Sequence, residues 1–118
     1  MEHQLAAYTD CNHGEGMAVL HPVYYRHIYR DGLKKFVRFA RNVWGISGEG
    51  KSEEALAEAG IDALADFIRE IGLPTTLREL GLKDRKQMEE IAESCHFSPG
   101  SYRKMTSGEL LEIFQECF

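Results

Sequence analysis

The chain has 118 residues, of which 43% are hydrophobic, so its length and composition fit one small domain with an ordinary apolar core. A net charge of −5 argues against a general affinity for nucleic acids or anionic membranes. No apolar run approaches the roughly 20 residues that a membrane-spanning helix needs, and the start Glu2-His3-Gln4 does not resemble a secretory signal, so we expect a cytoplasmic protein.

The three cysteines, Cys11, Cys95 and Cys117, are odd in number and irregularly spaced. This pattern argues against a disulfide framework and for a reducing compartment. No CxxC pair or Cys-Cys-His-His spacing is present, which argues against a structural zinc site. We expect all three to be structural or incidental, since free cysteine behaves as a small buried hydrophobe.

The first segment, residues 1–8, is predicted to be the end of a helix in which Leu5 and Tyr8 share a face. No capping residue precedes it, and so short a helix is not stable alone in water, so we expect the chain to begin inside an element. Residues 9–15 are rich in Asp, Asn and Gly and predict a loop, with His13 at a glycine-flanked bend.

A helical pattern resumes at Gly16, and apolar residues between Val19 and Ile28 form one stripe. Pro22 lies within this stripe and leaves two alternatives. Either the helix is kinked there, or Pro22 sits in the first turn and the helix starts later. The pair Asp31-Gly32 ends the pattern.

The next helix is predicted within residues 33–44, with basic residues on the side opposite its apolar stripe. The stripe consists of Leu33, Phe36, Val37, Ala40, Val43 and Trp44, and the basic face of Lys34, Lys35, Arg38 and Arg41. The glycine-rich loop at residues 45–51 lacks the GxxxxGK[ST] spacing and follows no strand, so it is not expected to bind phosphate.

Ser52 is a suitable N-cap for a further helix, which Gly72 and Pro74 would end. Its apolar face is predicted to comprise Leu56, Gly60, Ala63, Leu64, Phe67, Ile68 and Ile71.

In the last third of the chain, capping patterns predict where the helices and turns begin. Residues 76–79 fit a capping box that opens a single short turn ending at Gly81. Asp84 begins a helix that reaches Cys95, residues 97–104 form a loop, and Thr106 opens a last helix. No strand pattern longer than a few residues occurs. The predicted fold class is therefore all-α, with five to six helices packed pairwise as a bundle.

Histidines are the candidate functional residues. His3 lies on the first helical segment, and His13 precedes a residue without a side chain, which would leave room for a bulky group. Neutral imidazole is the commonest transition-metal ligand, but a catalytic metal usually takes three or more protein ligands, so the residues alone suggest half of a site. A loop histidine bonded to neighbouring backbone is the commoner case. His21 and His27 are expected to be packing or surface groups, and His96 ends a helix, where an imidazolium suits the dipole.

Residues 3–22 resemble the second signature of the iron-containing alcohol dehydrogenases. Residues 35–46, residues 71–77 and the terminal Lys104-Met105-Thr106 are similar to the butanol-dehydrogenase branch of that family. The resemblance covers essentially the whole chain, and the His13-Gly14 step is its most specific element.

This resemblance implies a dehydroquinate-synthase-like enzyme of two domains, with a metal in the cleft between them. Residues 1–118 would form the C-terminal all-helical metal-site domain, without the N-terminal domain that binds NAD or NADP. In the family an Asp and three His hold the metal. The last His corresponds to His13, and the third ligand belongs one helical turn before His3, ahead of Met1. His3 matches a histidine near the nicotinamide and substrate, which implies a catalytic and cofactor-binding role. His21 departs from the family pattern and is assigned no role.

The implied reaction interconverts primary, butanol-like alcohols and aldehydes with NAD or NADP. Fe²⁺, with Zn²⁺ as an alternative, would act as a Lewis acid, and His3 would orient the substrate or relay a proton. The full-length enzyme is expected to be a homo-oligomer, and this polypeptide alone is expected to be inactive. Two alternatives stay open: a stand-alone helical interaction domain without activity, and a basic-faced module, Lys34 to Arg41, that binds an acidic partner.

Overall fold

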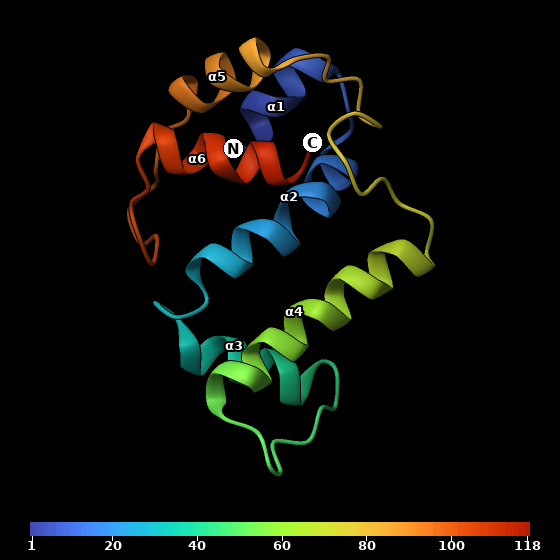
Figure 1. Cartoon of the computed structure of the whole chain (residues 1–118), viewed down its shortest axis with the longest axis vertical. Helices are drawn as coiled ribbons and strands as arrows, with labels where there is room; N and C mark the ends of the chain where they lie inside the picture. The colour runs from blue at the N-terminus through green and yellow to red at the C-terminus, as the bar shows by residue number, and fades with distance from the viewer.

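The computed structural model describes residues 1–118 and contains six helices and no strand (Figure 1). The helices are α1 (Glu2–Thr9), α2 (His13–Ile28), α3 (Leu33–Asn42), α4 (Glu53–Glu70), α5 (Arg85–Ser94) and α6 (Ser107–Glu116). The all-α class and the number of helices predicted from the sequence are thus confirmed. None of the six has the length and apolar character needed to cross a bilayer.

The helices form two groups joined by α2 (Figure 1). In one group α1 packs on α5, and α5 packs on α6; in the other, α3 packs on α4. Helix α2 contacts α1 and α6 in the first group and α4 in the second, so it connects the two groups. A core of 22 buried residues extends through both groups. The N-terminal histidines therefore lie on the group formed by α1, α5 and α6 with the start of α2.

Helix starts were the most predictable features, because a cap is a local interaction. The amide of Ala55 donates to Ser52 Oγ at 3.1 Å, and the amide of Gln87 donates to Asp84 Oδ1 at 3.0 Å. Residues 76–81 form the predicted short turn, which ends at Gly81 with φ 91°.

The start of α2 differs from the prediction. The helix begins at His13 rather than at Gly16, because the side chain of Asn12 accepts a hydrogen bond from the amide of Glu15 at 2.9 Å. The chain reverses at Asp10, with φ 54°, so the bend does not depend on a glycine. Pro22 lies in the interior of α2, which makes the alternative of a later helix start wrong.

The buried faces of α3 and α4 were only partly predicted. Val43, Phe67 and Ile71 were assigned to apolar faces, yet they are 61%, 44% and 51% exposed. Ala57 and Ile61, which were not assigned, are fully buried. The reason is that α4 turns Ala57, Gly60 and Ile61 rather than Phe67 toward its neighbours, and the contact with α3 is close enough to need a glycine.

We predict that Gly60→Ala destabilises the protein. A Cβ at this position would lie 2.8 Å from the Cβ of Ala40 and 3.0 Å from its Cα, so the α3–α4 contact would have to open. Overpacking of this kind costs about 1–3 kcal/mol, which outweighs the gain of up to about 1 kcal/mol in helix propensity. The control is Gly108→Ala, where the nearest atom is 3.7 Å away. Thermal melts should show a lower Tm for Gly60→Ala and an unchanged or higher Tm for Gly108→Ala; equal melting points would contradict the prediction.

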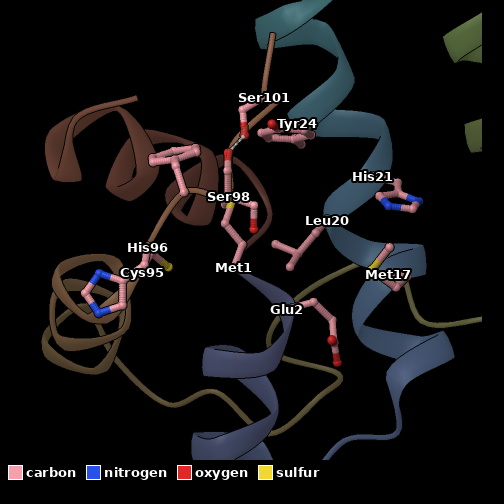
Figure 2. A pocket seen from close by; sticks show the side chains of 11 residues that line it. Met1, Glu2, Met17, Leu20, His21, Tyr24, Cys95, His96, Ser98 and Ser101 are labelled. Atoms are coloured by element: carbon pink, nitrogen blue, oxygen red, sulfur yellow. Dashed lines mark hydrogen bonds between the residues drawn. The ribbon is translucent and has the colours of Figure 1, made fainter. Parts of the chain in front are cut away.

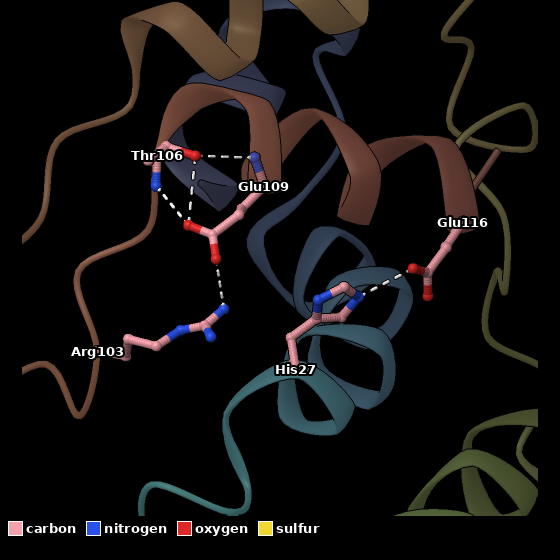
Figure 3. A network of polar contacts seen from close by, with 5 residues as sticks. All are labelled: His27, Arg103, Thr106, Glu109 and Glu116. Atoms are coloured by element: carbon pink, nitrogen blue, oxygen red, sulfur yellow. Dashed lines mark hydrogen bonds and ion pairs between the residues drawn. The ribbon is translucent and has the colours of Figure 1, made fainter.

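A polar network fixes the start of α6 (Figure 3). The amide of Thr106 donates to Glu109 Oε2 at 2.8 Å, and the amide of Glu109 donates to Thr106 Oγ1 at 3.2 Å, which completes a capping box. Arg103 Nη2 also donates to Glu109, at 2.8 Å. The hydrogen bond from the Thr106 amide, assisted by the charge of Arg103, lowers the pKa of Glu109 below its ordinary value. Nearby, His27 Nε2 lies 2.9 Å from Glu116 Oε1 and links α2 to α6.

This network predicts acid-sensitive stability. Because the pKa of Glu109 is lowered on folding, its contribution is present above the unfolded-state pKa of about 4.3 and is lost as the pH falls below it. Glu109→Gln should therefore lower Tm at neutral pH and reduce the fall in Tm as the pH drops from about 5 toward 3. The control is Glu112→Gln, an exposed residue of the same helix. Identical pH profiles for the two variants would show that Glu109 does not contribute in this way.

The three cysteines are free, as the sequence predicted. Cys117 is 3% exposed and belongs to the core, and burial raises its pKa to about 12. Burial also raises the pKa of the half-buried Cys95. A thiol with a raised pKa is a poor nucleophile, so Cys117 has a packing role.

Candidate metal centre

The structure brings together the two histidines that the sequence singled out. Helix α1 packs against the start of α2, because the chain reverses at Asp10 between them. As a result His3 and His13 face each other, with their ring centroids 5.8 Å apart and their planes inclined by 31°. Their side chains are 87% and 66% exposed, so both imidazoles are open to a ligand.

A third residue, Glu2, lies between them and was missed in the sequence. Its Oε2 is 2.7 Å from His13 Nδ1 and 3.6 Å from His3 Nε2. Only 8% of Glu2 is exposed, although burial of a carboxylate is unfavourable unless it is hydrogen-bonded. The available signal was the acidic residue directly before His3, but nothing in the local spacing indicated a bond to a residue eleven positions later.

These three residues have the donor chemistry of a transition-metal site. One ligand atom from each of Glu2, His3 and His13 can be chosen so that all three lie within 4.8 Å of one another. Imidazole and carboxylate donors suit iron and zinc, whereas soft thiolates are not involved. The residues present thus fit the Fe²⁺ or Zn²⁺ expected from the sequence resemblance.

The glycine that matters for close approach is Gly16 rather than Gly14. A Cβ at Gly14 would meet only Asn12 Oδ1, at an ordinary 3.5 Å. A Cβ at Gly16 would lie 3.0 Å from Cγ of Glu2 and 3.3 Å from its Oε1. The space beside Gly14 is therefore open, as expected for a position that leaves room beside His13, whereas the close contact at Gly16 is with the Glu2 side chain.

A cavity of about 260 Å³ adjoins this cluster (Figure 2). It lies among the N-terminal end of α1, one face of α2 and the segment that follows α5. Its lining includes Glu2 and His21, and it also comprises Met1, Met17, Leu20, Tyr24, Cys95, His96, Phe97, Ser98 and Ser101. More than half of these residues are hydrophobic, so the cavity could hold a small molecule with an apolar portion.

His21, which received no role from the sequence, borders this cavity. Its ring stacks on Tyr25 at 4.9 Å, with an interplanar angle of 16°. Burial lowers the pKa of His21, and the charge of His13 lowers it further, so His21 is neutral at pH 7. It packs as a neutral ring, in agreement with the prediction of a packing group.

Fold and site together define a class: an all-helical domain whose first two helices carry a carboxylate and two imidazoles beside an apolar cavity. The family model described as "Fe-containing alcohol dehydrogenase family, C-terminal" matches residues 1–118. The chain belongs to the iron-containing alcohol dehydrogenase family, as its signature segment predicted.

Named relatives place the chain in the butanol-dehydrogenase-like branch. It is 34% identical to NADH-dependent butanol dehydrogenase A of Clostridium acetobutylicum over 122 residues, which covers 100% of this chain and 31% of that enzyme. It is 35% identical to 1,3-propanediol dehydrogenase of Citrobacter freundii, and the match covers 100% of this chain and 31% of that enzyme. The crystal structure of a 1,3-propanediol oxidoreductase superposes with a TM-score of 0.90 at 31% identity, covering 99% of this chain and 31% of that one. The chain thus spans about a third of the length of these relatives, all of which are named as alcohol or diol oxidoreductases.

Proposed function

We propose that residues 1–118 form the C-terminal helical metal-site domain of an iron-dependent, NAD(P)-linked alcohol dehydrogenase acting on primary, butanol-like alcohols and their aldehydes. The observation that carries the proposal is the convergence of His3, His13 and Glu2 at one place in a chain of this family. The Clostridium relatives are named as NADH-dependent, which favours NAD over NADP, and the family name favours Fe²⁺ over Zn²⁺.

In this proposal His13 holds the metal through one ring nitrogen. When bound, a ferrous ion would supply a Lewis acid that lowers the pKa of the alcohol, and a nicotinamide cofactor would supply the hydride acceptor. His3 orients the substrate and takes up the hydroxyl proton. Because its side chain is 87% exposed, His3 can pass that proton to solvent. In the reverse direction the same imidazole returns a proton to the alcohol oxygen.

The adjoining cavity supports a small, largely apolar substrate. Glu2 and His21 border it on the side of the cluster, while Leu20, Tyr24 and Phe97 provide apolar surface. A short alkyl chain would bury against these side chains with its hydroxyl toward the histidines, and each buried methylene contributes about 0.8 kcal/mol. A steady gain in kcat/KM with the first few added carbons is the expected consequence.

The exposed apolar residues Val43, Phe67 and Ile71 favour a second candidate, a helical interaction domain without activity. The codons upstream of Met1 in the source genome separate the two. A histidine codon just before Met1, with a glycine-rich nucleotide-binding stretch further upstream, would support the enzyme. An in-frame stop codon and a ribosome-binding site there would favour the independent module.

We predict that a polypeptide of these 118 residues shows no turnover by itself. It supplies two candidate histidines, and it corresponds to about a third of the length of the named dehydrogenases. The measurement is the absorbance of reduced nicotinamide after anaerobic incubation with butanol, NAD⁺ or NADP⁺ and Fe²⁺. Butanol dehydrogenase A of Clostridium acetobutylicum serves as the positive control. Clear formation of reduced nicotinamide by the 118-residue chain would refute the prediction.

A further inference from the structure

We propose that Glu2 is a positioning residue: its carboxylate fixes His13 in the tautomer that carries the proton on Nδ1 and leaves the lone pair of Nε2 free. The tautomer follows from the geometry of this chain alone. Only the consequence, that a metal binds at Nε2, rests on the proposed function.

A short hydrogen bond joins the side chains of Glu2 and His13. Glu2 Oε2 and His13 Nδ1 are 2.7 Å apart, the length of a charge-assisted hydrogen bond. An ionised carboxylate can only accept, so the proton must be on Nδ1. In a neutral imidazole the other nitrogen is then an acceptor, available as a ligand. Histidines that bind metals usually donate their second ring N–H to a group of this kind.

The side chain of Glu2 is held in place by α1 and α2. It is 8% exposed, and it lies in the first turn of α1, where the helix dipole favours a negative charge. Its side chain lies against Gly16 of α2, so close that a Cβ there would crowd both Cγ and Oε1. A side chain fixed on two helices can impose an orientation on His13, whose own side chain is 66% exposed.

The direct alternative is that Glu2 is itself a ligand, together with His3 and His13. Exposure favours the positioning role: the carboxylate is buried, while both imidazoles are open to solvent. The open side of the cluster is therefore formed by the rings. The free nitrogen of His13 is the one that does not face Glu2.

The test is nitrogen NMR of the ¹⁵N-histidine-labelled 118-residue chain, which reports the protonation of each ring nitrogen. At about pH 8.5, roughly two units above the ordinary pKa of histidine, we expect Nδ1 of His13 to be protonated and Nε2 bare. Glu2→Met fills the space without offering the carboxylate, and should abolish this preference. Glu2→Gln keeps an oxygen acceptor and should retain it in part. Glu70→Met, the same substitution at an exposed position, should leave it unchanged.

A Zn²⁺ titration of the same samples measures metal binding independently of any assay of catalytic activity. We expect Zn²⁺ to shift Nε2 of His13, with 10- to 100-fold weaker binding for Glu2→Met. Three results would overturn the inference. They are protonation of His13 on Nε2 in the wild-type chain, an unchanged preference for Nδ1 protonation in Glu2→Met, and a Zn²⁺-induced shift at Nδ1 instead of Nε2. Absence of any Zn²⁺ shift would overturn the consequence that a metal binds at Nε2, while the tautomer itself is decided on the metal-free chain.

Discussion

Replacing His13 with alanine is expected to lower kcat/KM for alcohol oxidation by at least about 100-fold in the complete protein that carries these residues. The reason is that His13 is proposed to bind the metal directly, and loss of a group that only orients a ligand already costs 10- to 100-fold. The metal content of the purified protein, measured by mass spectrometry, should fall together with activity. The alcohol should then lose the Lewis acid that lowers its pKa.

The matched control is His27→Gln. His27 lies on the same helix, 14 residues and thus about 21 Å further along, and glutamine can keep its hydrogen bond to Glu116. This variant should keep both metal and activity. Full metal content in His13→Ala, or an equal loss in both variants, would show that His13 is not the ligand we propose.

Phe114→Ala is expected to have the largest effect on stability. Phe114 is completely buried in the core cluster and belongs to α6, a helix that packs against α2 and α5. Truncation of a buried phenylalanine costs about 3–5 kcal/mol, while a domain of this size is stable by about 5–15 kcal/mol. Urea unfolding followed by far-UV circular dichroism should show a large loss, with a fraction of the chain unfolded at physiological temperature.

Phe67→Ala is the same substitution on a partly exposed residue. Phe67 is 44% exposed and touches the ring of Trp44, with centroids 5.8 Å apart. About half of its surface is already in water, so the expected loss is about 1 kcal/mol. Similar unfolding midpoints for the two variants would mean that the core does not depend on α6 as described.

Local chemistry explains what the sequence could predict. Ser52, Asp84 and Thr106 were recognised as helix starts, because each caps an amide three residues later and the signal is complete within one turn. Asn12 carries the same signal, with Glu15 three residues on. The glycines around His13 nevertheless suggest a loop, whereas in the structure Gly14 and Gly16 both lie within α2.

Packing explains what the sequence could not predict. Periodicity shows which residues share a helix face, but it does not show how that face turns toward its neighbours. For this reason Phe67 and Ile71 were assigned to the core of α4, while the contact with α3 is made through Gly60. At the site, the two histidines were found by their residue type and by the family signature. Glu2 was not found, since its bond to His13 exists only after the chain reverses at Asp10.

His13 is proposed to bind a ferrous ion. The most direct measurement is anomalous X-ray scattering at the iron edge, from crystals of the complete protein grown anaerobically with Fe²⁺. We expect a single strong iron peak about 2.1 Å from Nε2 of His13, the usual distance between a metal and an imidazole nitrogen. An iron peak elsewhere in the protein, or no peak near either ring nitrogen of His13, would contradict it.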